Sequence, residues 1–417
     1  MTDHAPPRLD WRRLVPLVVS TVPPLVALVL CASALGDYRG VPLQPDAANY
    51  LALADTFGWD RLWGGVREPV WPTLLAGPIA VAGPEPMVLR AFGLLFFPLL
   101  VVAFQHLATS VVSRWWALLG GLLVAISPWL RVQALEGLRE VPAAAGLLLL
   151  VAALVRRRGS YGWREGLLLG TGAGLLALLR WDTILISVPL LVLSALLRRA
   201  HPRDTAVALS AIAVLTAPLT MGNLQQYGDP LYHSNIHAVF FRNVEFGGQP
   251  GYPTREELAR DAYAGPPTSW AAYLFRDRPL GDLRNKTLEG GPIGVLEISK
   301  VAATGRARHD YHALQLPPES DDLVPWGFLL STGVATLLLL HRRQWHLAVF
   351  VPLVVFQLAP VQHIMDARLG ISVYPVSVLC VLVVLDGLSG RLSFLRTSRD
   401  PASVAGRERS GPLVDSN

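Results

Sequence analysis

Side chains that could move a proton or bind an anion gather in a few short polar segments of the sequence. The first segment contains Asp46 and Tyr50, followed by Arg67 and Glu68. The residues after Asp46 have helical spacing, which predicts a short helix with Asp46 near its start. A carboxylate there could act as a general base toward a hydroxyl group. The alternative is that Asp46 only caps this helix beside Pro45, since Asp favours cap positions.

Two further segments combine acids with arginine. The stretch SPWLRVQALEGLREVP holds Glu136 and Glu140, with Arg139 beside them. Because the two acids are four residues apart, one helix would place both on one face. The alternative is a salt-bridged cap at the membrane interface. In LLALLRWDTILI, Arg180 and Asp182 occupy a very short turn between two apolar runs. That pair either contacts a substrate or is solvated at the level of the lipid headgroups.

The fourth segment, QHIMDARLGISVYP, places His363, Asp366 and Arg368 before the last apolar run. An arginine on the translocated side of a membrane opposes the usual charge bias, so a compensating role is expected. A guanidinium group can hold a phosphate through two parallel hydrogen bonds. We therefore expect Arg368, and after it Arg180, to bind a phosphate.

A long polar stretch, residues 222–323, contains His233 with His237 and His309 with His312. These spacings are compatible with metal ligation on a helix, but the HExxH signature is absent. We interpret all four as surface or packing histidines. The sequence also lacks the Walker A, GxGxxG and GxSxG motifs, so it offers no signature of a nucleotide site or a serine hydrolase.

The polar segments lie between apolar runs that are long enough to be membrane helices. Hydrophobic residues make up 52% of the 417 residues and charged residues 16%, compared with about 25% charged residues in soluble proteins. A helix needs about 20 apolar residues to cross a bilayer. The sequence therefore predicts an all-α polytopic membrane protein. The runs are residues 14–35, 69–84, 88–111, 115–131, 141–155, 165–179, 183–197, 204–221, 324–340, 345–361 and 369–389.

The arginines predict which runs cross the membrane, because basic residues favour the cytoplasmic side. If residues 69–84, which contain four prolines, are re-entrant or interfacial, every arginine cluster falls on the side of the N-terminus. This predicts about ten transmembrane helices with both termini cytoplasmic. The outer loops are then 36–87, 132–140 and 222–323. The many aromatic residues of the last loop predict a small ordered cap of helical and irregular structure.

The composition also limits the kinds of molecule that this protein can be expected to bind. The net charge of +5 comes from residues at the ends of apolar runs, which excludes a nucleic-acid surface and favours membrane lipid as the surroundings. Only Lys286 and Lys300 are lysine, as in GC-rich bacterial genomes, so we expect a multi-pass protein of a bacterial plasma membrane. The expected domains are a membrane module at 1–221, an outer loop domain at 222–323, C-terminal membrane helices at 324–390 and a cytoplasmic tail at 391–417.

These segments together resemble the GT-C superfamily of membrane glycosyltransferases, which includes protein mannosyltransferases and the aminoarabinose transferases of lipid A. The resemblance covers the first 200 residues and the last two apolar runs. It rests on an acid and a tyrosine in the first outer loop, on REP and WP motifs, on a second acidic turn and on a late YP. The residues are Asp46, Tyr50, Ala52, Ala54, Arg67, Glu68, Pro69, Trp71, Pro72, Ser127, Pro128, Glu140, Arg368, Tyr374 and Pro375.

The resemblance implies transfer of a sugar from a polyprenyl-phosphate carrier to an acceptor hydroxyl on the extracytoplasmic face, with inversion at the anomeric carbon. It implies that Asp46 is the catalytic base and that Glu140 assists it. Many members have a second acid after the first, whereas Ala47 follows Asp46 here, so the need for a divalent cation stays open. The residues expected to bind substrate are Tyr50, Arg67, Glu68, Glu136, Arg139, Arg180, Asp182 and Arg368.

Two other functions compete with transfer. A transporter or flippase of a lipid-linked substrate would use the same outer arginines but should also place ionisable residues near mid-membrane. The apolar runs hold almost none: His106 and Asp386 lie toward the ends of theirs. A non-catalytic assembly subunit would tolerate replacement of Asp46.

Overall fold

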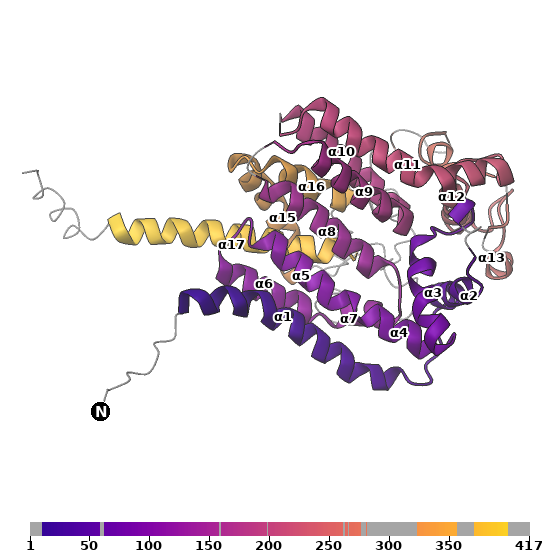
Figure 1. Cartoon of the computed structure of the whole chain (residues 1–417), viewed down its shortest axis with the longest axis horizontal. Coiled ribbons are helices and arrows are strands. Elements are labelled where there is room, and N and C mark those ends of the chain that lie inside the picture. The colour runs from indigo at the N-terminus through magenta and orange to yellow at the C-terminus, as the bar shows by residue number, and fades with distance from the viewer. Residues whose placement is uncertain are drawn as a thin grey trace, which may run out of the picture.

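The computed structural model describes residues 11–58, 62–157, 160–197, 199–261, 263–265, 267–276, 281, 323–356 and 371–398. In these residues the regular elements are helices, apart from one isolated bridge between Tyr161 and Ala200 (Figure 1). The elements are α1 (Trp11–Leu35), η1 (Gly36–Tyr38), α2 (Pro45–Asp55), α3 (Val70–Ala82), α4 (Pro86–Leu94), α5 (Phe96–Ala108), α6 (Arg114–Ala125), α7 (Pro128–Leu135), α8 (Glu140–Arg156), α9 (Trp163–Leu179), η3 (Trp181–Thr183), α10 (Ile184–Leu196), α11 (Pro202–Tyr227), α12 (Tyr232–Phe246), α13 (Arg255–Arg260), η4 (Ala272–Arg276), α15 (Leu323–His341), α16 (Trp345–Phe356) and α17 (Val373–Ser398).

Within the described residues, each predicted apolar run forms a helix or a pair of helices. Four helical stretches are long and apolar enough to cross a membrane, and α6 with α7, bent by 55°, would make a fifth. These stretches support a membrane protein. The total of ten spans remains a prediction, because other apolar helices are shorter than a full crossing. The four stretches are Val15–Tyr38, Pro86–Ala108, Pro202–Tyr227 and Val373–Gly390.

The helices pack as a bundle in which α9 lies along α11, α5 along α8, and α1 against α5 and α6. Glycines allow the closest approach. A Cβ placed on Gly170 of α9 would lie 2.2 Å from the carbonyl oxygen of Ala208 on α11, and one on Gly166 would lie 2.5 Å from that of Asp204. Small residues at such a contact let two helix backbones meet, which is how helices associate in lipid.

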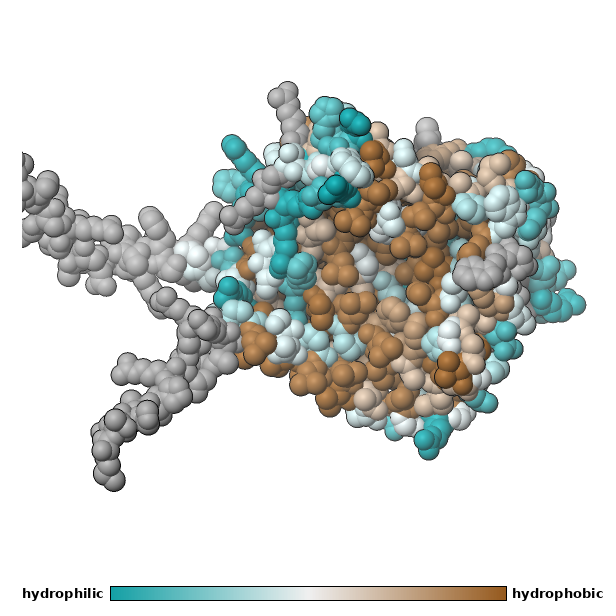
Figure 2. All heavy atoms as spheres, viewed as in Figure 1, coloured by the Kyte–Doolittle hydropathy of each residue, from teal (hydrophilic) through white to brown (hydrophobic). Residues whose placement is uncertain are grey.

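The outer surface of the bundle is apolar. Figure 2 shows apolar residues across the middle of one face, with hydrophilic residues toward both its left-hand and right-hand ends. Leu168, Leu196, Val214 and Leu330 each expose more than two thirds of their surface. An apolar surface of this kind is rare in soluble monomers and fits contact with lipid.

The loops rich in arginine meet at one end of the molecule. Arg156 donates a hydrogen bond to the Ser110 hydroxyl at 2.8 Å, and the N–H of Tyr161 donates to the carbonyl of Arg199 at 3.1 Å. This convergence agrees with the shared side that the charge pattern predicts. We call it the basic end; it comprises residues 106–114, 156–157, 160–164, 199–203 and 341–345.

The opposite end carries α2, α3, α12 and α13 (Figure 1), and we call it the cap end. Here α11 continues to Tyr227, five residues beyond the predicted start of the loop domain, and Gly228 ends it in the left-handed region at φ 71°. Helix α12 then forms in a stretch predicted only as part of the cap. At the other boundary, α17 runs on to Ser398, past the predicted start of the tail.

Candidate functional site

Helix α2 carries Asp46 in its first turn, as predicted. Gln44 occupies the cap position and Pro45 the first helical position, so the alternative that Asp46 caps the helix is wrong. Instead, Asp46 Oδ1 accepts a hydrogen bond from Arg67 Nη2 at 2.7 Å. The Asp46 side chain is 27% exposed, whereas that of Glu68 is 4% exposed. Asp46 is therefore accessible from outside the protein and Glu68 is not.

A segment after α2, residues 63–68, fastens several elements to one another, and we call it the strap. Its Gly65 N–H donates to Asn223 Oδ1 on α11 at 2.8 Å, while Arg67 reaches back to α2. Strap and helix approach closely because Gly222 has no side chain: a Cβ there would overlap the carbonyl of Trp63. The strap thereby places Arg67 and Glu68 side by side at the cap end.

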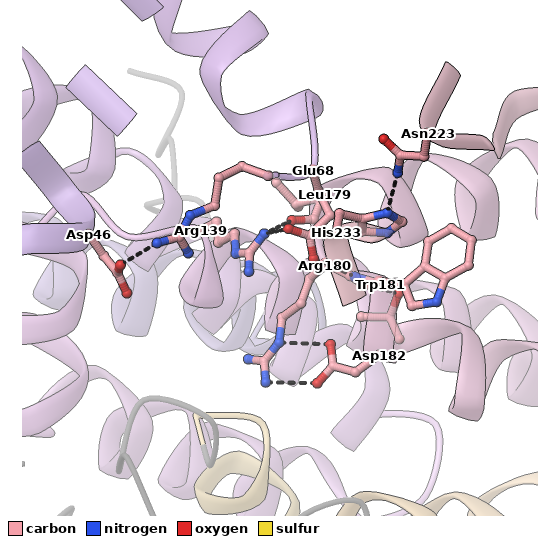
Figure 3. Close-up of polar contacts among 11 residues, drawn as sticks. Asp46, Glu68, Arg139, Leu179, Arg180, Trp181, Asp182, Asn223 and His233 are labelled. Atoms are coloured by element: carbon pink, nitrogen blue, oxygen red, sulfur yellow. Dashed lines mark hydrogen bonds and ion pairs between the residues drawn. The ribbon is translucent and has the colours of Figure 1, made fainter. Parts of the chain in front are cut away.

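Glu68 forms the buried centre of the site (Figure 3). Its Oε2 accepts a hydrogen bond from Arg139 Nη1, and its Oε1 accepts one from the backbone N–H of Trp181 at 3.2 Å. Burial alone would raise the pKa of Glu68, but the guanidinium of Arg139 lowers it well below the usual range. Glu68 is therefore ionised and ties the start of α8 to the turn before α10.

Arg180 and Asp182 form a two-bond ion pair in the turn between α9 and α10 (Figure 3). Arg180 Nε donates to Asp182 Oδ1 and Nη2 donates to Oδ2, both at 2.8 Å. The Arg180 side chain is 7% exposed, so the alternative of a pair solvated among headgroups is wrong for the arginine. Such a fork fixes the plane of the guanidinium and therefore the direction of its remaining donors.

Tyr50 links the arginines. It is 1% exposed, and the guanidinium groups of Arg67 and Arg139 lie 5.6 and 5.7 Å from the centre of its ring. Burial raises the pKa of its hydroxyl, so Tyr50 stays neutral. An aromatic ring beside two cations stabilises both without neutralising them. Tyr50 thus holds two positive charges close to Asp46 and Glu68.

The expectation that one helix carries Glu136 and Glu140 is wrong. Helix α7 ends before Glu136, because Gly137 adopts the left-handed region at φ 68°, and α8 begins at Glu140. The two acids then diverge: Glu136 acts electrostatically on Tyr38, whereas Glu140 acts on Tyr50 and Arg180. Glu140 is buried and its Oε2 has no hydrogen-bond partner among the described residues. Arg139 pairs with neither acid.

Two histidines that sequence reasoning set aside belong to the site. Helix α12 places His233 edge-on against Trp181, with ring centres 4.9 Å apart, and His237 close to Tyr263, at 6.4 Å. Glu68 acts electrostatically on both. Burial lowers the pKa of His233, and it lowers that of His237 to about 4, so both are neutral at pH 7. Their spacing of four residues, noted for metal ligation, was the only sequence signal.

A cavity of about 440 Å³ opens at the cap end, between α2 and the strap. Arg67, the ion-pair partner of Asp46, is part of its wall, and so is Asn49, one helical turn after Asp46. A cavity of this size and mixed character is typical of a small-molecule site. Its other walls include Leu53, Phe57, Pro72 and Tyr263.

The described residues do not fit a divalent cation. No group of three or more His, Cys, Asp or Glu that could hold a metal ion occurs among them. Asp46, Glu68 and Asp182 each accept hydrogen bonds from an arginine. A guanidinium already supplies the positive charge that a cation would bring to these carboxylates. No chemical step is therefore assigned to a metal.

Five of the residues considered from the sequence lie outside the residues that the structure describes. They are Arg368, the expected phosphate ligand, with Asp366, His363, His309 and His312.

Solved structures with a similar fold are archaeal oligosaccharyltransferases. An oligosaccharyltransferase from Archaeoglobus fulgidus, determined with zinc and sulfate, is 13% identical and has a TM-score of 0.51; the match covers 91% of this chain and 49% of that one. AglB from the same organism, determined with an inhibitory peptide and a dolichol-phosphate, is 12% identical with a TM-score of 0.50, over 94% and 52%. This chain has a GT-C fold. It spans about half the length of both neighbours.

At this sequence identity the structural similarity shows the fold alone. The activity has to be inferred from the residues of the site. No family model matches the sequence. No curated protein matches it either. The subtype suggested by the resemblance, a protein mannosyltransferase or an aminoarabinose transferase, therefore remains a prediction.

Proposed function

We propose that this protein is a glycosyltransferase that moves a sugar from a polyprenyl-phosphate carrier to an acceptor hydroxyl at the extracytoplasmic membrane face. One observation carries the proposal: on a GT-C fold, an accessible carboxylate, Asp46, pairs with Arg67, which lines a cavity at the cap end. Transfer from a sugar phosphate needs a base for the acceptor and positive charge for the departing phosphate. The cap end supplies both.

The proposed step is a direct displacement at the anomeric carbon. The acceptor oxygen attacks the anomeric carbon, and its proton passes to Asp46. The bond from that carbon to the phosphate oxygen breaks, and the polyprenyl phosphate leaves with the electron pair, inverting the anomeric centre. Arg180, held in plane by Asp182, and Arg139 favour this departure electrostatically. The buried carboxylate of Glu140 acts on Tyr50 and Arg180, in keeping with an assisting role.

The neighbour determined with a dolichol-phosphate supports a lipid-linked donor. A donor of this kind is also required by location, since nucleotide sugars are cytoplasmic and an enzyme acting outside needs a sugar that a membrane can deliver. The cavity lined by Arg67 is the proposed acceptor side, and the buried arginines are the proposed donor side.

Mass spectrometry of envelope glycans and of lipid-linked sugars, with and without the gene, tests the proposal. We expect deletion to remove one glycosyl substituent and to leave its polyprenyl-phosphate donor in excess. Unchanged glycans and unchanged donor would overturn the proposed function. The purified protein should also transfer sugar when the donor is supplied on the cap side of a vesicle, whereas a flippase would move the donor without consuming it.

A further inference from the structure

The amide of Asn223 has only one orientation that satisfies both of its neighbours. Asn223 is fully buried on α11. Its Oδ1 accepts a hydrogen bond from the Gly65 N–H of the strap at 2.8 Å, and its Nδ2 lies 2.9 Å from Nδ1 of His233. A backbone N–H can only donate, so the atom facing Gly65 must be the oxygen. The atom facing His233 is therefore the NH₂ group.

This orientation fixes the proton of His233. Because Asn223 Nδ2 donates, Nδ1 of His233 must accept and carries a lone pair. In a neutral imidazole the proton then resides on Nε2. Burial lowers the pKa of His233, so the neutral form persists at pH 7. The ring has one available tautomer, and it presents an N–H on the side facing away from Asn223.

That N–H has no use within the described part of the protein. Nε2 of His233 is buried and has no hydrogen-bond partner there. The charged groups acting on the ring are Glu68 of the strap, Arg139 at the start of α8 and Asp229 of the turn before α12. An unpaired buried donor is unfavourable, so this N–H needs an acceptor that the described residues do not supply.

We propose that His233 is a substrate-binding residue whose neutral Nε2–H donates a hydrogen bond to a hydroxyl oxygen of the transferred sugar. Trp181, in edge contact with the ring, supplies an aromatic wall beside the donor. A neutral donor suits a hydroxyl, whereas an imidazolium would add a charge beside Arg139 and hold the phosphate product. Asn223 acts as a positioning residue, because it sets the tautomer without touching the substrate.

The assignment of a sugar hydroxyl as the acceptor rests on the proposed function, but the assignment of the His233 tautomer does not. Two matched variants separate the roles of the two ring nitrogens. In His233→Gln the amide nitrogen lies near the position of Nε2 and keeps a neutral donor there. In His233→Asn it lies near Nδ1 and the Nε2 donor is lost. His346, buried on α16 and bonded to Ser194 at 2.8 Å, provides His346→Gln as a control far from the strap.

Activity is measured as the envelope glycan restored when each variant complements a deletion strain, normalised to folded protein in the membrane. We expect His233→Gln to stay within a few-fold of wild type and His233→Asn to fall about tenfold or more, as for one lost hydrogen bond to substrate. Equal activity of His233→Asn and wild type, at equal folded amounts, would overturn the proposal. Equal losses in both variants with lowered thermal stability would also overturn it, since that pattern marks a purely structural histidine.

A second measurement does not depend on transfer. Nitrogen NMR of histidine-labelled full-length protein in lipid nanodiscs reports which ring nitrogen is protonated. We expect one buried histidine, absent from His233→Gln, with its proton on Nε2 from pH 6 to 8. In Asn223→Asp the carboxylate must accept from both neighbours, so the proton should move to Nδ1 or the ring should become cationic. An Nδ1-protonated ring in the wild type would overturn the assignment, whether or not the glycan experiment succeeds.

Discussion

Arginine pairs differently at the two ends of the molecule. At the basic end, Arg157 lies 3.5 Å from Glu165, and the two side chains are 37% and 40% exposed. At the cap end, the Arg139 and Glu68 side chains are 9% and 4% exposed. Exposed pairs contribute little to stability and serve the charge bias that orients the chain. Burying a charged pair costs desolvation free energy, so its presence at the cap end points to a functional site rather than to a topology signal.

Introduced cysteines can test whether the two ends face opposite sides of the membrane. Cys31 and Cys380 are both buried, so we expect a thiol reagent to label only an introduced cysteine. In intact cells we expect Gln249→Cys at the cap end to react fully with an impermeant thiol reagent and Ser160→Cys at the basic end to react only after permeabilisation. Labelling in the reverse order would refute the predicted topology.

Removal of one buried partner should have the largest effect on stability. Arg139→Ala leaves the Glu68 carboxylate buried without its guanidinium, which typically costs about 3 to 5 kcal/mol. Denaturant or thermal unfolding of the purified protein in detergent measures the loss. The matched control at the basic end, Arg157→Ala, should leave the unfolding transition unchanged because its pair is exposed. Adding Glu68→Gln should restore part of the stability that Arg139→Ala loses. Similar losses of stability in Arg139→Ala and Arg157→Ala would contradict the difference between the two ends.

The carboxylate of Asp46 should matter for turnover far more than for folding. Asp46→Asn keeps the size of the side chain and a hydrogen-bonding oxygen for Arg67, but removes the base. We expect transfer to fall about 100-fold or more. Restored glycan in a deletion strain complemented with the variant reports turnover, and the amount of folded protein in the membrane is the control. Normal glycan levels with Asp46→Asn would remove Asp46 from the role of base.

Sequence patterns predicted the helices well because hydrophobic runs and turn residues act locally. Asp46 was placed correctly on a short helix, since Pro45 and the helical spacing after it are local signals. Glu136 and Glu140 were misplaced on one helix, because spacing alone does not show that Gly137 turns the chain between them.

The contacts that assemble the site were beyond sequence reasoning, since they join residues far apart in the chain. Glu68 meets Arg139 and Trp181 across distances of 71 and 113 residues, and Gly65 meets Asn223 across 158. No local pattern encodes such a contact. The spacing of His233 favours a packing residue, and its burial and Asn223 partner agree with packing, whereas the role proposed for its Nε2–H could not be predicted from the sequence.

The fork of Arg180 offers a finer test of the donor side. Lysine keeps the positive charge but cannot make two parallel hydrogen bonds to Asp182. The cationic group then loses its fixed orientation. We expect Arg180→Lys to raise the apparent KM for the lipid-linked donor about tenfold, with a smaller change for the acceptor. Arg342→Lys at the basic end, where Arg342 lies 3.7 Å from Asp386, should leave both unchanged. An equal effect on donor and acceptor would place the phosphate elsewhere.

The smallest expected effect is a pH dependence confined to the cap end. Burial lowers the pKa of His237 to about 4, against about 6.5 in an unfolded chain. The groups that face it are Glu68, Arg67, Arg139 and Asp46. Between these two pKa values the unfolded state binds the proton that the folded state excludes, so stability falls as pH decreases from 6.5 toward 4 and is constant above 6.5.

This linkage predicts a loss of about 1 to 2 kcal/mol between pH 7 and pH 5 that His237→Gln abolishes. Unfolding of the two proteins in parallel over that range measures the difference, and titration of the remaining groups cancels in it. Glu68 cannot mimic the effect, because its pKa is lowered well below this range by Arg139. If the two proteins lose stability equally, His237 is protonated or solvated in the folded state, and the burial that distinguishes the ion pairs of the cap end from those of the basic end does not extend to His237.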